Sequence, residues 1–146
     1  MYKKKYKPKK KRTERQKAED ELWRVFSLWI RQRDADDNGY MKCISCGKVI
    51  HWRDGGNCHA GHYYSRGIRS VKYHEKNSNG QCYSCNMHQE GNKQGYAVGL
   101  IKKYGEGVLD ELMICKNNTS KLGTQEMKIL TNDYLRRLKE NGYATV

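Results

Sequence analysis

Two Cys-x-x-Cys pairs constrain the fold of this 146-residue chain more than any other feature. The first pair is Cys43 and Cys46, and the second is Cys82 and Cys85. A Cys-x-x-Cys turn places two thiolates at zinc-bond length from one point, so two such turns can complete a tetrahedral site. The 35 residues between the pairs, 47–81, must fold inside the loop that a zinc ion would close. Because the mean hydropathy is −1.05, the apolar core should be small, and structural zinc is expected to supply much of the folding free energy.

Disulfide bonds are the alternative use for the six cysteines. The N-terminus runs from Met1 into lysines rather than into the apolar segment of a secretory signal, and no stretch approaches the about 18 apolar residues of a membrane helix. We therefore expect a reducing cytoplasm, where spaced cysteine pairs usually bind metal. Cys58 could replace one zinc ligand, whereas Cys115 is expected to be a small buried side chain.

The positive charge of the chain is concentrated in residues 1–12. The whole chain holds 29 lysines and arginines against 16 acidic residues, a net charge of +13, whereas residues 13–146 are only +5. The first twelve residues contain no acid and eight cations, namely Lys3, Lys4, Lys5, Lys7, Lys9, Lys10, Lys11 and Arg12. Such a block should be disordered alone and should bind the phosphates of DNA, with a solubilising tail as the alternative. Membrane binding is not expected, because no apolar face accompanies the charges.

Helices are predicted on both sides of the cysteine-bracketed segment. The first should span about residues 14–34 and begin at a capping box formed by Thr13 and Gln16. Its apolar stripe consists of Leu22, Val25, Phe26, Trp29 and Ile30. The last helix should be capped by Thr124 and should end at Asn141-Gly142. Two shorter helices are expected near residues 96–104 and 108–114.

The central segment predicts a small α+β unit. Residues 40–50 suit a strand or a zinc-knuckle turn, residues 58–65 a short strand, and residues 85–94 a helix. Two strands and a helix, held together by a structural zinc ion, would form a ββα core flanked by the N- and C-terminal helices. The expected organisation is a disordered basic tail (1–12), an N-terminal helix (13–39), a zinc-bound ββα core (40–95) and a C-terminal helical region (96–146).

The central residues resemble the HNH, or ββα-metal, endonucleases, and more closely the NinG (Rap) recombination proteins of lambdoid phages. The resemblance covers about residues 22–140 and is strongest in three runs, Cys58-His59-Ala60-Gly61-His62-Tyr63, Asn77-Ser78-Asn79-Gly80-Gln81-Cys82 and Cys85-Asn86-Met87-His88-Gln89-Glu90-Gly91-Asn92. It implies a phage endonuclease that hydrolyses phosphodiester bonds in branched DNA, such as Holliday junctions and D-loops, in the cytoplasm of the infected bacterial host cell.

The alternative is a zinc-stabilised module that binds branched or single-stranded DNA without cutting it. Both functions explain the charge and the cysteines, but only the nuclease explains why His62, Asn77 and Asn86 occur together at these spacings. Neither function needs a membrane or a small-molecule cofactor. A homodimer would suit a two-fold symmetric four-way junction.

The resemblance implies a role for each of these residues. His62 would activate the attacking water, Asn77 would brace the active loop, and Asn86 would open the helix and bind a catalytic Mg²⁺ or Mn²⁺ ion. In the loop between them, Arg66 and Arg69 would contact phosphate, unless that loop is only solvated. The asparagines would also suit turns and helix caps, and a purely structural or zinc-binding histidine is the alternative for His62.

One departure from the family pattern concerns the metal. Many HNH enzymes carry an acidic metal ligand directly before the catalytic histidine, where this chain has Gly61. His59, three residues before the catalytic position, is one substitute. Glu90 is another, because residues four apart share a helix face and Asn86 lies four residues earlier. His88 is expected to be a surface histidine, although it falls on the same helix.

Overall fold

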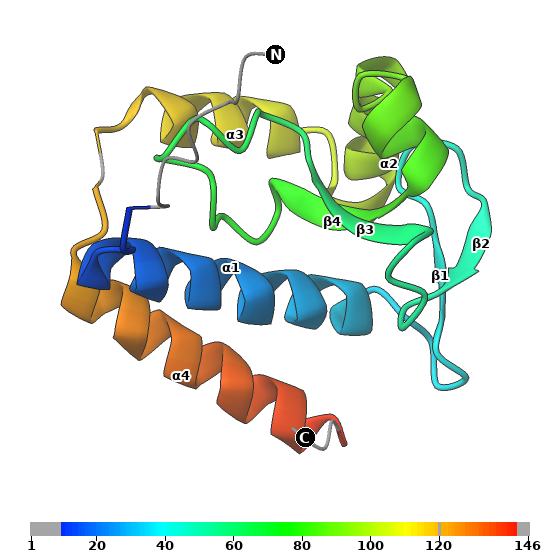
Figure 1. Ribbon diagram of the computed structural model, residues 1–146. Helices are drawn as coiled ribbons and strands as arrows, with labels where there is room; N and C mark the ends of the chain where they lie inside the picture. Colours follow the sequence, from blue (N-terminus) through cyan, green and yellow to red (C-terminus); the bar gives the residue numbers. More distant parts are fainter. Residues whose placement is uncertain (1–9, 120, 143–146) are drawn as a thin grey trace, which may run out of the picture.

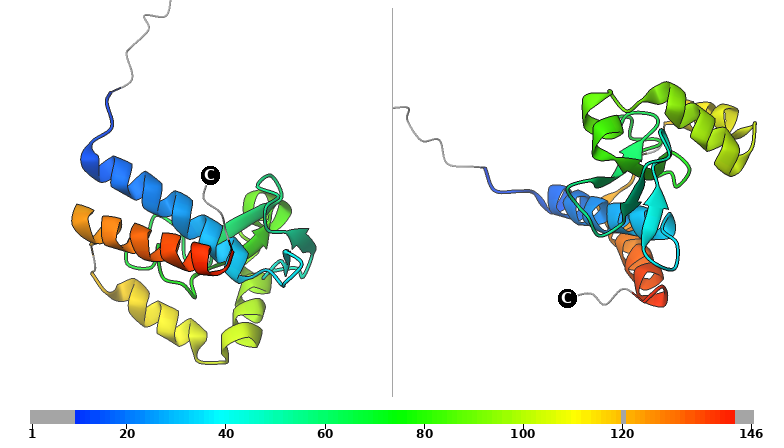
Figure 2. Two further views of the ribbon diagram at one scale, coloured as in Figure 1. Left: turned by 90° about the horizontal axis from the view of Figure 1, so that it is seen from below. Right: turned by 90° about the vertical axis from the view of Figure 1, so that its right-hand side faces the viewer.

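The computed structural model describes residues 10–119 and 121–142, which fold as a mixture of helices and short antiparallel strands. In chain order the elements are α1 (Glu14–Arg33), β1 (Tyr40–Lys42), β2 (Val49–His51), β3 (Cys58–His62), β4 (Ser78–Cys82), the π-helical turn η1 (Ser84–His88), α2 (Lys93–Tyr104), α3 (Val108–Asn117) and α4 (Thr124–Glu140). The strands form two hairpins, β1–β2 and β3–β4. Helices α1 and α4 lie side by side on one side of β3–β4, and α2 and α3 lie on the other (Figures 1 and 2). The α+β class predicted from the sequence is confirmed.

Helix α1 matches its prediction closely. The capping box of Thr13 and Gln16 is present, and all five residues of the apolar stripe are buried. The stripe packs against buried residues of α4, where the Phe26 and Tyr134 rings meet edge to face with centroids 5.1 Å apart. Among the described residues, no helix is both long and apolar enough to cross a membrane.

The ends of α4 show one correction. Thr124 is the first residue of the helix rather than its cap, and Gly123 takes the cap position. The Glu126 carboxylate reaches back to accept the Gly123 N–H at 2.6 Å, which satisfies the exposed backbone donor of the cap residue. The predicted end at Asn141-Gly142 is confirmed, with Gly142 in the left-handed region at φ +82°.

The helix predicted over residues 85–94 is broken in the structure. Turn η1 ends at His88, and residues 90, 91 and 92 have φ values of +50°, +87° and +41°, which no right-handed helix contains. Asn92 then caps α2, accepting the Gly95 N–H at 3.3 Å. Consequently Asn86 lies in the middle of η1 rather than at a helix start, and Glu90 is not one turn further along the same helix. The strand predicted over 58–65 is also shorter and ends at His62.

Strand β4 was not predicted. Its sequence, Ser-Asn-Gly-Gln-Cys, is typical of a turn, yet all five residues are buried. Buried polar side chains need hydrogen-bond partners, and those of Asn79 and of the Gln81 amide nitrogen come from distant elements. The Asn79 carbonyl oxygen accepts from Arg33, Lys103 and Tyr104, and the Gln81 amide donates to Ser45 and to the Gly91 carbonyl. Long-range polar contacts thus stabilise this strand.

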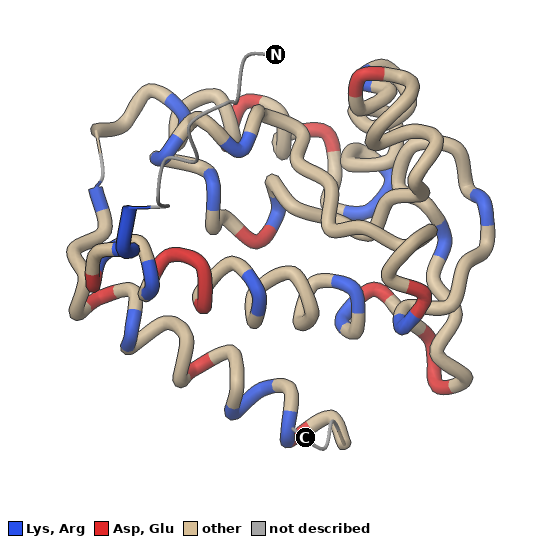
Figure 3. The backbone as a smooth tube through the Cα atoms, viewed as in Figure 1, with Lys and Arg blue, Asp and Glu red and all other residues tan. Residues whose placement is uncertain are grey.

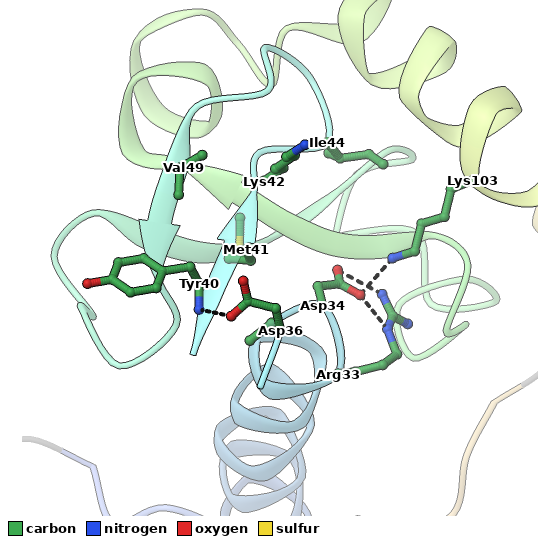
Figure 4. A pocket seen from close by; sticks show the side chains of 10 residues that line it. Arg33, Asp34, Asp36, Tyr40, Met41, Lys42, Ile44, Val49 and Lys103 are labelled. Carbon is green, nitrogen blue, oxygen red and sulfur yellow. Dashed lines mark hydrogen bonds and ion pairs between the residues drawn. The ribbon is translucent and has the colours of Figure 1, made fainter. Parts of the chain in front are cut away.

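A buried carboxylate connects the end of α1 to β4 and α2 (Figure 4). Asp34 forms ion pairs with Arg33 at 2.7 Å and Lys103 at 2.6 Å, and it accepts the Gly80 N–H at 2.7 Å. Burial opposes its ionisation, but the two cations hold the pKa of the Asp34 carboxyl below its usual range.

Replacing Asp34 with asparagine should lower the free energy of unfolding by about 3–5 kcal/mol, because Arg33 would lose its carboxylate while remaining largely buried. Urea unfolding measures the loss. Asp20→Asn is the matched control, since its ion pair with Arg12 is exposed and should be worth less than about 1 kcal/mol. Equal losses in the two variants would contradict the structural role of Asp34.

The predicted basic tail falls mostly outside the described residues, which exclude 1–9. Lys10, Lys11 and Arg12 are exposed and belong to no helix or strand. Arg12 donates from Nε to Asp20 at 3.0 Å, so this cation has a partner on α1.

Candidate zinc centre and catalytic site

The four paired cysteines meet at one point. Their sulfur atoms all lie within 4.8 Å of one another, and the Cys46 and Cys82 sulfurs are 3.8 Å apart. Tetrahedral zinc with Zn–S bonds of about 2.3 Å needs sulfur–sulfur distances of about 3.8 Å. Cys43, Cys82 and Cys85 are buried and Cys46 is exposed. This cluster could bind a metal such as zinc, as the spacing predicts.

Local structure explains how the sulfurs converge. The Cys43 N–H bonds to the Lys48 carbonyl at 2.8 Å, and Gly47, at φ +76°, closes the turn between β1 and β2. The other pair spans the end of β4 and the first turn of η1, where the Cys85 N–H points at the Cys82 sulfur at 3.4 Å. Residues 43–47 are called the knuckle below.

The other two cysteines lie outside this cluster. Cys58 lies opposite Cys82 in the register of the β3–β4 hairpin, but its thiol contacts the Met41 sulfur at 3.2 Å. Burial raises the pKa of the Cys58 thiol to about 11. It therefore does not replace a zinc ligand. Cys115 is half-buried on α3, not fully buried as expected.

A second cluster of predicted residues surrounds a cavity of about 400 Å³, called the site cavity. His62 of β3, Asn86 of η1 and Glu90 line it, together with Arg66 and Lys93. The lining does not include Arg69, which is exposed in the same loop as Arg66. Thus the fold gathers these residues, which are up to 31 positions apart in the sequence, at the junction of β3, its loop, η1 and the start of α2.

His59 and Asn86, two of the predicted metal ligands, are in direct contact. The His59 Nδ1 atom lies 2.9 Å from the Asn86 side-chain nitrogen. Both side chains are half-buried, whereas Glu90 is exposed in the turn after η1. An imidazole nitrogen and an amide oxygen from this pair could bind one divalent ion together.

The imidazole of His62 is fixed by contacts on two sides. Its Nε2 atom lies 2.8 Å from the Lys72 carbonyl oxygen. Because a carbonyl oxygen can only accept, Nε2 carries the proton, and in the neutral ring Nδ1 is the acceptor. Its ring stacks on Trp23 of α1, with centroids 5.1 Å apart and an interplanar angle of 27°. Lys72 is itself paired with Glu19 of α1 at 2.6 Å.

Asn77 holds the loop that carries these contacts. It is fully buried, and its amide nitrogen donates to the Tyr64 and Val71 carbonyls at 3.0 and 3.1 Å. Its carbonyl oxygen accepts the Tyr64 N–H at 2.8 Å. All these partners are backbone groups of the β3–β4 loop, so Asn77 fixes the conformation of that loop.

Gly61 is required by packing. A Cβ atom at this position would lie 2.0 Å from the Gln81 side-chain oxygen and 2.9 Å from the Gln81 Cβ. Gln81 is fully buried, and its amide donates to the Gly91 carbonyl, which fixes its orientation. The space that a side chain at this position would need is therefore occupied.

Three residues that contact His62 or its partner Lys72 were not predicted from the sequence. Trp23 is not part of the apolar stripe of α1, so the helical spacing of apolar residues did not indicate its contact with His62. Glu19 pairs with Lys72, and no motif in the sequence singled it out. The third is Lys93, at the start of α2, whose ammonium group donates to the His62 carbonyl at 3.1 Å and also to that of Tyr63.

Burial, reinforced by the charges of Arg66, Lys72 and Lys93, lowers the pKa of His62 to about 4. The unfolded chain binds a proton on this ring below its ordinary pKa of 6.5, whereas the folded protein does so only near pH 4. The free energy of unfolding should therefore fall by roughly 3 kcal/mol as the pH is lowered through this range.

Urea unfolding of the wild type and of His62→Gln at several pH values tests this expectation. Zinc thiolates also titrate in acid, but they do so in both proteins, so the difference between the two curves isolates the histidine. A difference that does not change between pH 7 and pH 4 would contradict the expectation.

Comparison with known proteins gives one consistent set of relatives. Residues 1–142 match the family model described as Bacteriophage Lambda NinG protein. Over 117 residues the chain is 31% identical to Protein ninG of Escherichia phage lambda and of Salmonella phage P22, and 30% identical to that of Escherichia phage 933W. These alignments cover 80% of this chain, which spans about half (53–54%) of the length of the curated relatives. No solved structure matches the chain.

Proposed function

The chain belongs to the bacteriophage lambda NinG family, and on that premise we propose that it is a metal-dependent endonuclease that cuts branched DNA, such as Holliday junctions and D-loops, during phage recombination. The observation that carries the proposal is the geometry of His62. Its Nε2–H is committed to a carbonyl, its ring is held by stacking, and its ring lines a cavity beside the contacting pair of His59 and Asn86.

The arrangement of β3, β4 and η1 supports an HNH-like core. An antiparallel hairpin is followed directly by a short helical segment, which is the order of the ββα-metal fold. The predicted base lies at the end of the first strand, the predicted brace precedes the second, and a predicted metal ligand lies in the helical turn. The cysteine cluster joins the hairpin end to this turn, so structural zinc would fix the ligand relative to the base.

His59 and Asn86 are the residues that would hold the catalytic ion: Asn86 lines the site cavity, and His59 contacts Asn86 without being part of the lining. Glu90 also lines the cavity and could contribute a carboxylate. Such an ion, when bound, stabilises charge on the scissile phosphate and the leaving oxygen. A site with imidazole and amide ligands and only one nearby carboxylate favours manganese over magnesium.

The remaining steps belong to protein side chains. His62 takes a proton from the attacking water at Nδ1, and its Nε2–H stays bonded to the Lys72 carbonyl and holds the ring in place. Arg66 and Lys93 present positive charge at the cavity and attract the phosphate backbone. The lysine-rich residues 1–12, and Arg69 in the same loop as Arg66, would add contacts to DNA further from the cut.

Cleavage of labelled four-way junction, D-loop and linear duplex DNA tests the proposal. The protein is assayed without added divalent ion and then with Mg²⁺ or Mn²⁺, since a strong chelator would also remove structural zinc. We expect metal-dependent cutting of the branched substrates. Binding without cutting under every metal would instead support the alternative, a zinc-stabilised module that recognises branched or single-stranded DNA.

A further inference from the structure

Within the part of the chain that the structure describes, three lysines beside the knuckle lack an ion-pair partner, unlike many cations elsewhere. Acidic and basic residues are interspersed along α1 and α4 (Figure 3), where ion pairs such as Arg24–Glu21 at 2.7 Å and Arg136–Asp133 at 2.6 Å occur. Lys42, Lys48 and Lys102 are exposed and have no ion-pair partner among the described residues. These positive charges are therefore available to an external anion.

Two of these lysines line a groove of about 800 Å³ between the knuckle and α2, called the knuckle groove. Lys42 lies on one wall and Lys102 on the other, and Lys103 also lines it. No acidic residue is part of the lining. Lys103 is turned toward Asp34, with which it forms an ion pair (Figure 4). The Asp34 carboxylate also binds Arg33 and the Gly80 N–H.

The walls of the knuckle groove are in tight contact at its base. A Cβ atom at Gly95 would lie 2.3 Å from the Ser45 carbonyl oxygen, and one at Gly99 would lie 1.9 Å from that of Ile44. The backbone of α2 therefore touches the knuckle directly. The knuckle contains two of the clustered cysteines, Cys43 and Cys46. Such a groove is preformed, so an anion that binds there pays little ordering cost.

The knuckle groove is separate from the site cavity. The two share no lining residue, and the cavity has its own cations, Arg66 and Lys93. They approach each other at the start of α2, where Lys93 lines the cavity and Gln94 lines the groove. A nucleic acid that reaches the site cavity would thus pass close to a second surface with unpaired positive charge.

We propose that the knuckle groove binds the phosphodiester backbone of a second duplex arm of branched DNA, while the site cavity binds the arm that is cut. This inference rests on the proposed function and deepens it, because it assigns Lys42 and Lys102 as residues that distinguish branched from linear DNA. Phosphates are the matching ligand, since each lysine that neutralises one releases condensed counterions and makes binding depend on salt.

The test is the salt dependence of binding for the full chain carrying Lys42→Glu and Lys102→Glu. Affinities for a four-way junction and for a linear duplex are measured at several salt concentrations without added divalent ion. For the junction, the slope of log K against log salt should become shallower by about 2, which corresponds to two lost phosphate contacts. The slope for the linear duplex should stay unchanged.

Lys121→Glu with Lys139→Glu is the matched control, because both lysines are exposed and the change in net charge is the same. Zinc content and circular dichroism verify the fold of each variant. An unchanged junction slope, or equal changes for junction and duplex, would overturn the second-arm assignment. Neither result depends on cleavage, so failure of the nuclease proposal would appear separately, as wild-type protein that binds but does not cut.

Discussion

Replacing Cys82 with serine should abolish zinc binding and unfold the centre of the protein. Cys82 ends β4, is almost fully buried, and belongs to a cluster in which each sulfur lies within 4.8 Å of the others. Structural zinc sites contribute an apparent binding free energy of about 10–16 kcal/mol, which equals or exceeds the stability of a typical small domain. The apolar neighbours of the cluster are few, chiefly Met41 and Ile50, so packing alone cannot replace this contribution.

Metal analysis of the purified proteins and urea unfolding followed by circular dichroism measure the effect. The wild type should contain one zinc ion per chain and unfold cooperatively, and Cys82→Ser should lack both properties. Cys58→Ala is the matched control, because this cysteine faces Cys82 in the hairpin but contacts Met41 instead of the cluster. Full zinc content in Cys82→Ser, or loss of zinc in Cys58→Ala, would contradict the assignment of ligands.

The parts of the fold that could be predicted are those encoded by local pattern. Helix α1 combines a capping box with an apolar stripe, and both signals lie within its own residues. Strand β4 has no such signal, because Asn79 and the Gln81 amide nitrogen find their hydrogen-bond partners on α1, α2, the knuckle and the turn before α2. The break before α2 was not predicted for a related reason. The left-handed backbone of Asn92 follows from its place as the cap of α2, and the sequence alone did not indicate that α2 begins there.

The candidate site shows the same division. The family resemblance selected His59, His62 and Asn86; His62 and Asn86 line one cavity, and His59 contacts Asn86. Residue types and spacing were not sufficient to find Trp23 and Glu19, because these residues act on His62 and Lys72 from a helix about 40–50 positions earlier in the chain. The site therefore depends on α1, although the sequence placed that helix outside the nuclease core.

Replacing His62 with alanine should lower the rate of DNA cleavage by about 10²–10⁴-fold and leave DNA binding intact. The low pKa of His62 keeps the ring neutral at pH 7, so Nδ1 can accept a proton. Its bond to the Lys72 carbonyl holds the ring in place. No other imidazole lines the site cavity, so among the described residues none replaces this base.

Single-turnover cleavage of a four-way junction at saturating protein measures the chemical step separately from binding. His62→Gln is tested beside His62→Ala, because its amide can still donate to the Lys72 carbonyl but cannot accept the proton of water. The expected result is the same loss in both variants. His88→Ala is the control, since His88 lies on η1 but is exposed and outside the cavity lining. A rate within tenfold of the wild type in His62→Gln, with the fold preserved, would remove His62 from the role of base and leave the ring as a support for the loop beside Trp23.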